Sequence, residues 1–100
     1  MPEVEVHLHP PLSYKITSKK IGPLIITAEI KKGETLTNLL DRLSEENQEA
    51  WAGIYDSAIK KMRSPIRTIL NGIDLSPSVL VNTKLAENDK IVFMLVYGGG

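Results

Sequence analysis

The chain has 100 residues, enough for one domain with a core of modest size. Lysine and arginine together equal aspartate and glutamate, so no net positive charge indicates a nucleic-acid partner, and the absence of cysteine excludes disulfides and thiolate metal sites. No apolar run is long enough for a membrane span and the N-terminus lacks a signal-peptide pattern, so we expect a cytoplasmic protein without a membrane partner.

Two strands are predicted near the N-terminus. Apolar and polar residues alternate from Glu3 to His9, which is typical of a half-buried strand. Pro10-Pro11 interrupts this strand because proline cannot donate to a ladder, and Leu12 to Ile16 could resume it. Leu24 to Ile30 alternates in the same way after the turn signal Gly22-Pro23, so we expect an antiparallel hairpin.

The middle of the chain predicts helical structure. Thr35 is a suitable N-cap for a helix whose apolar stripe has helical spacing. The stripe consists of Leu36, Leu39, Leu40 and Leu43. A second stripe predicts another helix over about Gln48 to Met62, or a bent continuation of the first, with Trp51 and Tyr55 in the core. Ser64-Pro65 ends it.

More strands are predicted in the second half. Ile66 to Leu70 is a strand, and Asn71-Gly72 after it is the chain's strongest hairpin signal, because both central positions of a type I′ turn need positive φ. Ile73 to Leu75 returns from that turn, and Val79 to Val81 could form a short edge strand. The element order predicts one mixed sheet with helices on one face only.

The rest of the chain is organised around its last apolar run, Ile91 to Tyr97. Its β-branched and aromatic residues favour a strand, and a strand that is apolar on both sides is expected at the centre of a sheet. A single helical layer leaves one side of this strand at least partly open, and an open apolar patch is a candidate partner surface. The two sides are Val92, Met94 and Val96, and Phe93, Leu95 and Tyr97.

We assign Phe93, Leu95 and Tyr97 as the candidate partner-binding side chains. The alternative is that residues 12–16 or the second helix cover the open side. Gly98, Gly99 and Gly100 follow the strand, and without side chains they cannot pack. We therefore expect a single domain of residues 1–97 and a flexible tail that ends in a bare carboxylate.

No catalytic or metal-binding motif is evident in the sequence. His7 and His9 share a strand face, but two histidines without a third ligand nearby are more often a solvated face, so we expect no metal site. Composition alone permits a Ser/His/Asp catalytic set, but the sequence contains no nucleophile motif.

The combination of motifs resembles the molybdopterin-synthase small-subunit and thiamine sulfur-carrier family of ubiquitin-like β-grasp proteins. The matching pieces are the Asn71-Gly72 turn, the segment Leu85 to Phe93 that leads into the apolar strand, and the terminal glycines. Gly33 to Leu36 also resembles the start of the family's first helix. Val96-Tyr97 stand where two prolines are common in the small subunit, which leaves the pathway open.

The resemblance implies an α+β protein with the ubiquitin-like β-grasp fold, a mixed sheet of four to five strands with one or two helices packed on one face. It implies a sulfur carrier in cofactor biosynthesis, of molybdopterin type in the first place and of thiamine type as the other option. The carboxylate of Gly100 would be adenylated and converted to a thiocarboxylate, while Gly98 and Gly99 thread into the partner's active-site channel.

The resemblance also implies the partners. They are a ubiquitin-activating-like adenylyltransferase that uses ATP and Mg, a sulfur donor protein, and a larger synthase subunit or a thiazole-synthase-type enzyme. The chain itself would bind no cofactor and catalyse nothing. Two alternatives stay open, a protein modifier that is joined to lysines through Gly100 and a β-grasp interaction module with an inert tail.

Overall fold

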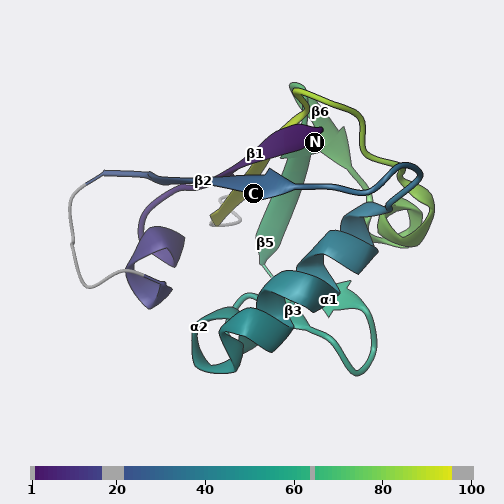
Figure 1. Ribbon diagram of the computed structural model, residues 1–100. Coiled ribbons are helices and arrows are strands. Elements are labelled where there is room, and N and C mark those ends of the chain that lie inside the picture. Colours follow the sequence, from purple (N-terminus) through teal and green to yellow (C-terminus); the bar gives the residue numbers. More distant parts are fainter. Residues whose placement is uncertain (1, 17–21, 64, 96–100) are drawn as a thin grey trace.

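The computed structural model describes residues 2–16, 22–63 and 65–95. In this part of the chain five strands form one mixed sheet in the order β2-β1-β7-β5-β6 (Figure 1). The strands are β1 (Glu3–Leu8), β2 (Leu24–Glu29), β5 (Ile66–Leu70), β6 (Ile73–Leu75) and β7 (Lys90–Leu95). β1 and β7 are parallel, and the other neighbours are antiparallel. None of the helices in the described ranges is long and apolar enough to cross a membrane.

The N-terminal hairpin is confirmed, but the segment after it is not a strand. β1 pairs with β2 in antiparallel register, and its apolar side chains point into the core. Residues Leu12–Lys15, expected to resume the strand, form the 3-10 helix η1 instead. The Leu12 amide donates to the His9 carbonyl at 2.9 Å, which closes a turn with Pro10 and Pro11 at its centre. Leu12 is fully buried, so this apolar residue packs into the core from a 3-10 turn and does not belong to a strand face.

The predicted first helix is α1 (Leu36–Glu46), which lies across one face of the sheet (Figure 1). Thr35 is its N-cap. The Thr35 hydroxyl accepts from the Asn38 amide, and the Asn38 side chain accepts from the Thr35 amide, both at 3.2 Å. Each bond satisfies a donor that the helix itself leaves open. The predicted stripe is buried and joins the core with the inner sheet residues; it consists of Leu36, Leu39, Leu40 and Leu43.

The prediction of a second helix to Met62 is wrong beyond its first turn. α2 spans only Gln48–Ala52, and the chain then forms a short hairpin of β3 (Tyr55–Asp56) and β4 (Lys61–Met62). Gly53 follows as the C-cap of α2. The Arg63 guanidinium donates through Nε to the Ala52 carbonyl at 2.8 Å, so a residue from beyond the hairpin satisfies an open carbonyl at the end of α2.

Tyr55 and Trp51 lie in the core, as predicted, although Tyr55 is in a strand. The Tyr55 hydroxyl donates to Asp41 Oδ1 at 2.9 Å, and the Lys60 ammonium donates to Asp41 Oδ2 at 2.6 Å. One carboxylate of α1 therefore binds both the first strand of the hairpin, through Tyr55, and its turn, through Lys60. Burial raises the pKa of the Tyr55 hydroxyl well above its usual value, and the hydrogen bond to Asp41 raises it further.

The Asn71-Gly72 hairpin is confirmed, with φ of +49° and +85° at its two central residues. The short edge strand predicted at Val79 to Val81 is wrong, because this segment is part of the 3-10 helix η2 (Pro77–Asn82). Pro77 begins η2, which suits its fixed φ, and Leu80 is the one buried residue in it. A lone buried leucine among exposed valines imitates a short apolar strand in the sequence.

A hydrogen-bond network around Asn71 sets the start of β7. The Asn71 side chain donates to Asp89 Oδ1 at 2.9 Å and accepts from the Lys90 amide at 2.8 Å. The Asp89 carboxylate also accepts from the Ala86 amide at 2.7 Å, and the Asp89 carbonyl accepts from the Glu5 amide at 3.0 Å. The turn before β7 is thereby joined to β1 through Glu5 and to the β5–β6 turn through Asn71.

We predict that Asn71→Ala lowers the free energy of unfolding by about 1–3 kcal/mol, because it removes two side-chain hydrogen bonds and places alanine at positive φ. Urea denaturation measures the change. Asn82→Ala is the control, an exposed residue at the end of η2, and should change the free energy by less than about 0.5 kcal/mol. Equal effects of the two substitutions would contradict a role for the Asn71 network.

Stability is predicted to fall at alkaline pH because of Tyr55. The folded-state pKa of Tyr55 is raised, so folding favours the neutral phenol. This contribution is complete below about pH 10, the usual tyrosine pKa, and is lost as pH rises above it, by at most about 1.4 kcal/mol per pH unit. Tyr55→Phe should therefore flatten the fall in unfolding free energy between pH 10 and pH 11. Parallel curves for the two proteins would refute the assignment.

Candidate functional site

The strand β7 is central in the sheet, as predicted, and its two sides have different environments. On the inner side Ile91 and Phe93 are both 0% exposed, and Leu95 is half-buried against the core. The Phe93 ring meets the edge of Trp51 with centroids 6.3 Å apart and planes at 83°, a favoured aromatic geometry. On the outer side Val92 and Met94 are half-buried.

The prediction that Phe93 belongs to a partner surface is therefore wrong for this chain. Its side chain faces the layer of helices, and Trp51 from α2 packs against it. Leu95 has the same orientation and is only partly accessible. Tyr97 and the three glycines, Gly98, Gly99 and Gly100, lie outside the described residues, so the assignments made for them and the domain boundary at residue 97 stay predictions.

The open side of β7 lies on what we call the outer sheet face, which comprises Ile25, His7, Ile69, Val92 and Met94. Strand register places four of them in one row across four strands, because His7 pairs with Ile25 and Val92, and Val92 pairs with Ile69. Ile25 is 54% exposed, and the others are half-buried. No helix of the described chain packs on this side, so it is an apolar surface open to solvent (Figure 1).

Polar and charged side chains border the outer sheet face, and some of them contact one another or His7 within it. The His7 ring and the Glu5 carboxylate lie 2.9 Å apart, and the Arg67 guanidinium binds Asp74 at 2.5 Å. Lys90 is exposed on the same side of β7. An apolar centre with a polar margin is the usual composition of a protein–protein interface.

No metal centre is formed by these residues. His7 and His9 both occur at the outer side of β1, but in residues 2–16, 22–63 and 65–95 no three His, Cys, Asp or Glu side chains form a group that could hold a metal ion. The hydrogen-bond partner of His7 is Glu5, two residues away on the same strand.

Sequence reasoning missed Ile25, His7 and Ile69 as members of this surface. Each lies on the side of its strand that faces away from the core, and strand alternation already separated those sides for β1 and β2. What alternation did not reveal is the parallel pairing of β1 with β7, which brings His7 beside Val92.

The end of β7 is positioned by its neighbours. Leu95 pairs with Ile66 at the start of β5, and Met94 pairs with Arg67. The described part of β7 therefore ends at the edge of the sheet where β5 begins, and the outer sheet face adjoins that end through Met94.

A scan of known protein families and a search of curated proteins find no match to the chain. Solved structures do match it over nearly the whole length. SAMP1 from Haloferax volcanii is 14% identical, with a TM-score of 0.69, and the match covers 98% of this chain and 99% of that one. Urm1 from Trypanosoma brucei is 17% identical, with a TM-score of 0.71 and coverage of 99% and 96%.

A third match is the small archaeal modifier protein 1 from Methanosarcina acetivorans, which is 20% identical, with a TM-score of 0.63 and coverage of 100% and 98%. At these identities the matches establish the fold. The chain has the ubiquitin-like β-grasp fold, an α+β arrangement with a mixed five-stranded sheet, as the sequence resemblance implied.

The two sides of β7 should respond differently to truncation. We predict that Phe93→Ala lowers the free energy of unfolding by about 3–5 kcal/mol, because it leaves a cavity beside Trp51, while Met94→Ala costs less than about 1.5 kcal/mol. Urea denaturation of both variants checks this. Similar losses would mean that Met94 is also a core residue and that the outer sheet face is not open.

Proposed function

We propose that the chain is a ubiquitin-like carrier whose last residue, Gly100, is activated by a partner enzyme and then carries sulfur. The observation that supports this most directly is the placement of β7. The buried inner side of this strand fixes it at the sheet centre, and only Val96 and Tyr97 separate its end at Leu95 from Gly98, Gly99 and Gly100 in the sequence. The full-length match of the fold to Urm1 and to proteins named as archaeal modifiers agrees with it.

The chemistry follows from the properties of a carboxylate, which is a poor acyl donor because its charge repels nucleophiles. In the proposed sequence an oxygen of the Gly100 carboxylate attacks the α-phosphate of Mg-bound ATP, and pyrophosphate leaves. A hydrosulfide equivalent from a sulfur donor protein then attacks the carbonyl carbon of the acyl adenylate. AMP leaves, one proton is released, and Gly100 carries a thiocarboxylate. The activating partner supplies ATP and Mg, and this chain supplies the acyl group.

The glycines and the outer sheet face have separate roles in this proposal. Gly98 and Gly99 let a tail without side chains enter a narrow channel, since three extended residues reach roughly 10 Å. The outer sheet face, centred on Val92 and Met94, is the surface on which the ubiquitin-activating-like adenylyltransferase and the enzyme that accepts the sulfur would dock. Phe93 supports this surface from behind and does not contact the partner.

The sulfur acceptor belongs to the finer part of the proposal. We place the carrier in cofactor biosynthesis in the cytoplasm, with a larger molybdopterin-synthase subunit as the first candidate and a thiazole-synthase-type enzyme as the second. A protein modifier joined to lysines through Gly100 is the competing function, and it is favoured by the names of the matching archaeal proteins. Both functions use the same adenylated intermediate.

The intact mass of the protein from its native cells tests the proposal. After incubation with ATP, Mg, a hydrosulfide source and the activating enzyme, we expect a mass gain that equals the replacement of one oxygen by sulfur. Deletion of Gly100 should abolish the gain. Met94→Glu, with the tail intact, should slow it while the protein stays folded, with a cooperative thermal transition, because this residue would act in docking and not in the core.

An unchanged mass, under conditions that activate a known carrier, would overturn the sulfur-carrier function. Lysine conjugates of the protein in cell extracts would then support the modifier. The absence of both products would leave a β-grasp interaction module with an inert tail.

A further inference from the structure

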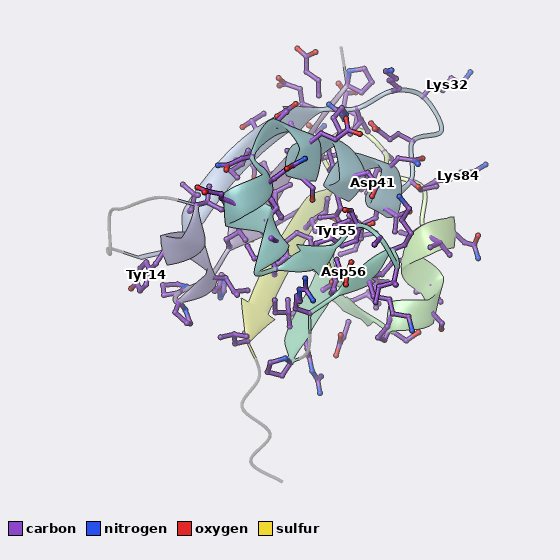
Figure 2. All side chains as sticks on the ribbon, turned by 90° about the horizontal axis from the view of Figure 1, so that it is seen from below. Tyr14, Lys32, Asp41, Tyr55, Asp56 and Lys84 are labelled. Atoms are coloured by element: carbon purple, nitrogen blue, oxygen red, sulfur yellow. The ribbon has the colours of Figure 1, made fainter. Side chains whose placement is uncertain are left out.

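The strand β2 has a long free edge. It is the last strand on its side of the sheet and pairs with β1 alone (Figure 1). Its register with β1 runs from Leu24 to Glu29 without a bulge, and it contains neither lysine nor proline. The nearest lysines after it are Lys31 and Lys32, and Figure 2 shows Lys32 on the loop between β2 and α1. Proteins usually protect a long edge strand with lysine, proline or a bulge, because an open edge pairs with other strands.

The pairing with β1 determines which backbone groups of β2 point to this edge. The Ile30 amide, directly after β2, donates to the Pro2 carbonyl at 2.9 Å, so even-numbered residues of β2 bond to β1. Bonded and non-bonded positions alternate in an antiparallel pair. The odd-numbered residues therefore direct their amides and carbonyls outward, and they are Ile25, Thr27 and Glu29. None of these three amides has a partner in the ranges that the structure describes.

Two positions at this edge cannot form a full pair of hydrogen bonds. The Glu29 carbonyl already accepts from Arg42 Nη2 at 2.7 Å, and the Glu34 carboxylate holds the Arg42 guanidinium at 2.9 Å. Pro23, two residues before Ile25, has no amide hydrogen. A strand that pairs with this edge must therefore place no donor opposite the Glu29 carbonyl and no acceptor opposite the nitrogen of Pro23.

We propose that this edge binds the β2 strand of a second copy of the chain, in antiparallel register with Ile26 opposite Ile26. Ile25 of each copy then exchanges two hydrogen bonds with Thr27 of the other. The Glu29 amide donates to the Pro23 carbonyl, and the occupied Glu29 carbonyl faces the nitrogen of Pro23, which has no hydrogen to donate. A shift of two residues places either the Glu29 carbonyl opposite the Ile25 amide or the Thr27 carbonyl opposite Pro23, so one amide or carbonyl loses its partner.

The side chains of β2 agree with this register. Ile26 is half-buried and would meet Ile26 of the second copy on the inner side of the sheet, while Ile25, which is 54% exposed, would lie beside Thr27. Glu29, the one charged residue of β2, faces no charge. The two copies then share one continuous sheet. Since β1 and β2 separate β7 from the interface, β7 stays accessible, and the inference does not depend on the carrier function.

The test is sedimentation of the full chain at concentrations from micromolar to millimolar, where we expect a reversible equilibrium between monomer and dimer. A mixed sample of ¹³C-labelled and unlabelled protein should show an intermolecular NOE between the α-hydrogens of Ile26, because the Cα atoms of such a non-bonded pair are only about 4.5 Å apart. A chain that stays monomeric throughout, or a dimer without this NOE, would overturn the proposal.

Thr27→Pro removes an amide that bonds only in the dimer, to the Ile25 carbonyl of the second copy, and should raise the dissociation constant of the dimer about tenfold or more. Asp74→Pro is the matched control on the other edge strand, β6. The Asp74 amide also points outward, because Leu70 and Ile73 form the bonded pair that flanks the turn. This control should leave the dissociation constant unchanged, and equal effects of the two substitutions would contradict pairing through β2.

Discussion

One layer of helices covers the five-stranded sheet on one side only. Because the other side stays uncovered in the described chain, the central strand β7 has two structural roles. Toward the helices, Ile91 and Phe93 are completely buried and form the middle of the core. Away from them, Val92 and Met94 form the middle of an apolar surface that no element of the described chain covers. The same six residues thus supply the rigid support and the exposed surface, and the rigidity of the surface comes from the burial of the side chains behind it.

The elements that could be predicted from sequence are those with a local chemical cause. Thr35 with the leucines after it specifies a capped helix, and Asn71-Gly72 specifies a tight hairpin, whatever surrounds them. The failures share a different cause. Leu12 and Leu80 are both buried in 3-10 turns, and a buried leucine next to other apolar residues resembles a short strand in the sequence. The hairpin after α2 depends on Asp41, which is distant in sequence and adds no signal to the segment's own pattern.

The candidate site was predictable only in part, for a physical reason. Both sides of residues 91–97 are apolar, so periodicity cannot indicate which side the helices cover. The choice is made by tertiary contacts such as the meeting of Trp51 with Phe93. The resemblance of short motifs identified the fold, which the full-length structural matches confirm, but it carried no information about the orientation of these side chains.

The parallel pairing of β1 with β7 has a consequence for how the molecule is made in the cell. The first strand of the described chain, β1, pairs with the last one, β7, and Leu8 lies opposite Phe93. During synthesis β1 and β2 can pair, but the sheet cannot be completed until Leu95 has emerged from the ribosome. The nascent chain therefore exposes the inner apolar side of β1 through most of its translation. Any enzyme that recognises the finished sheet therefore meets only chains whose synthesis has passed β7.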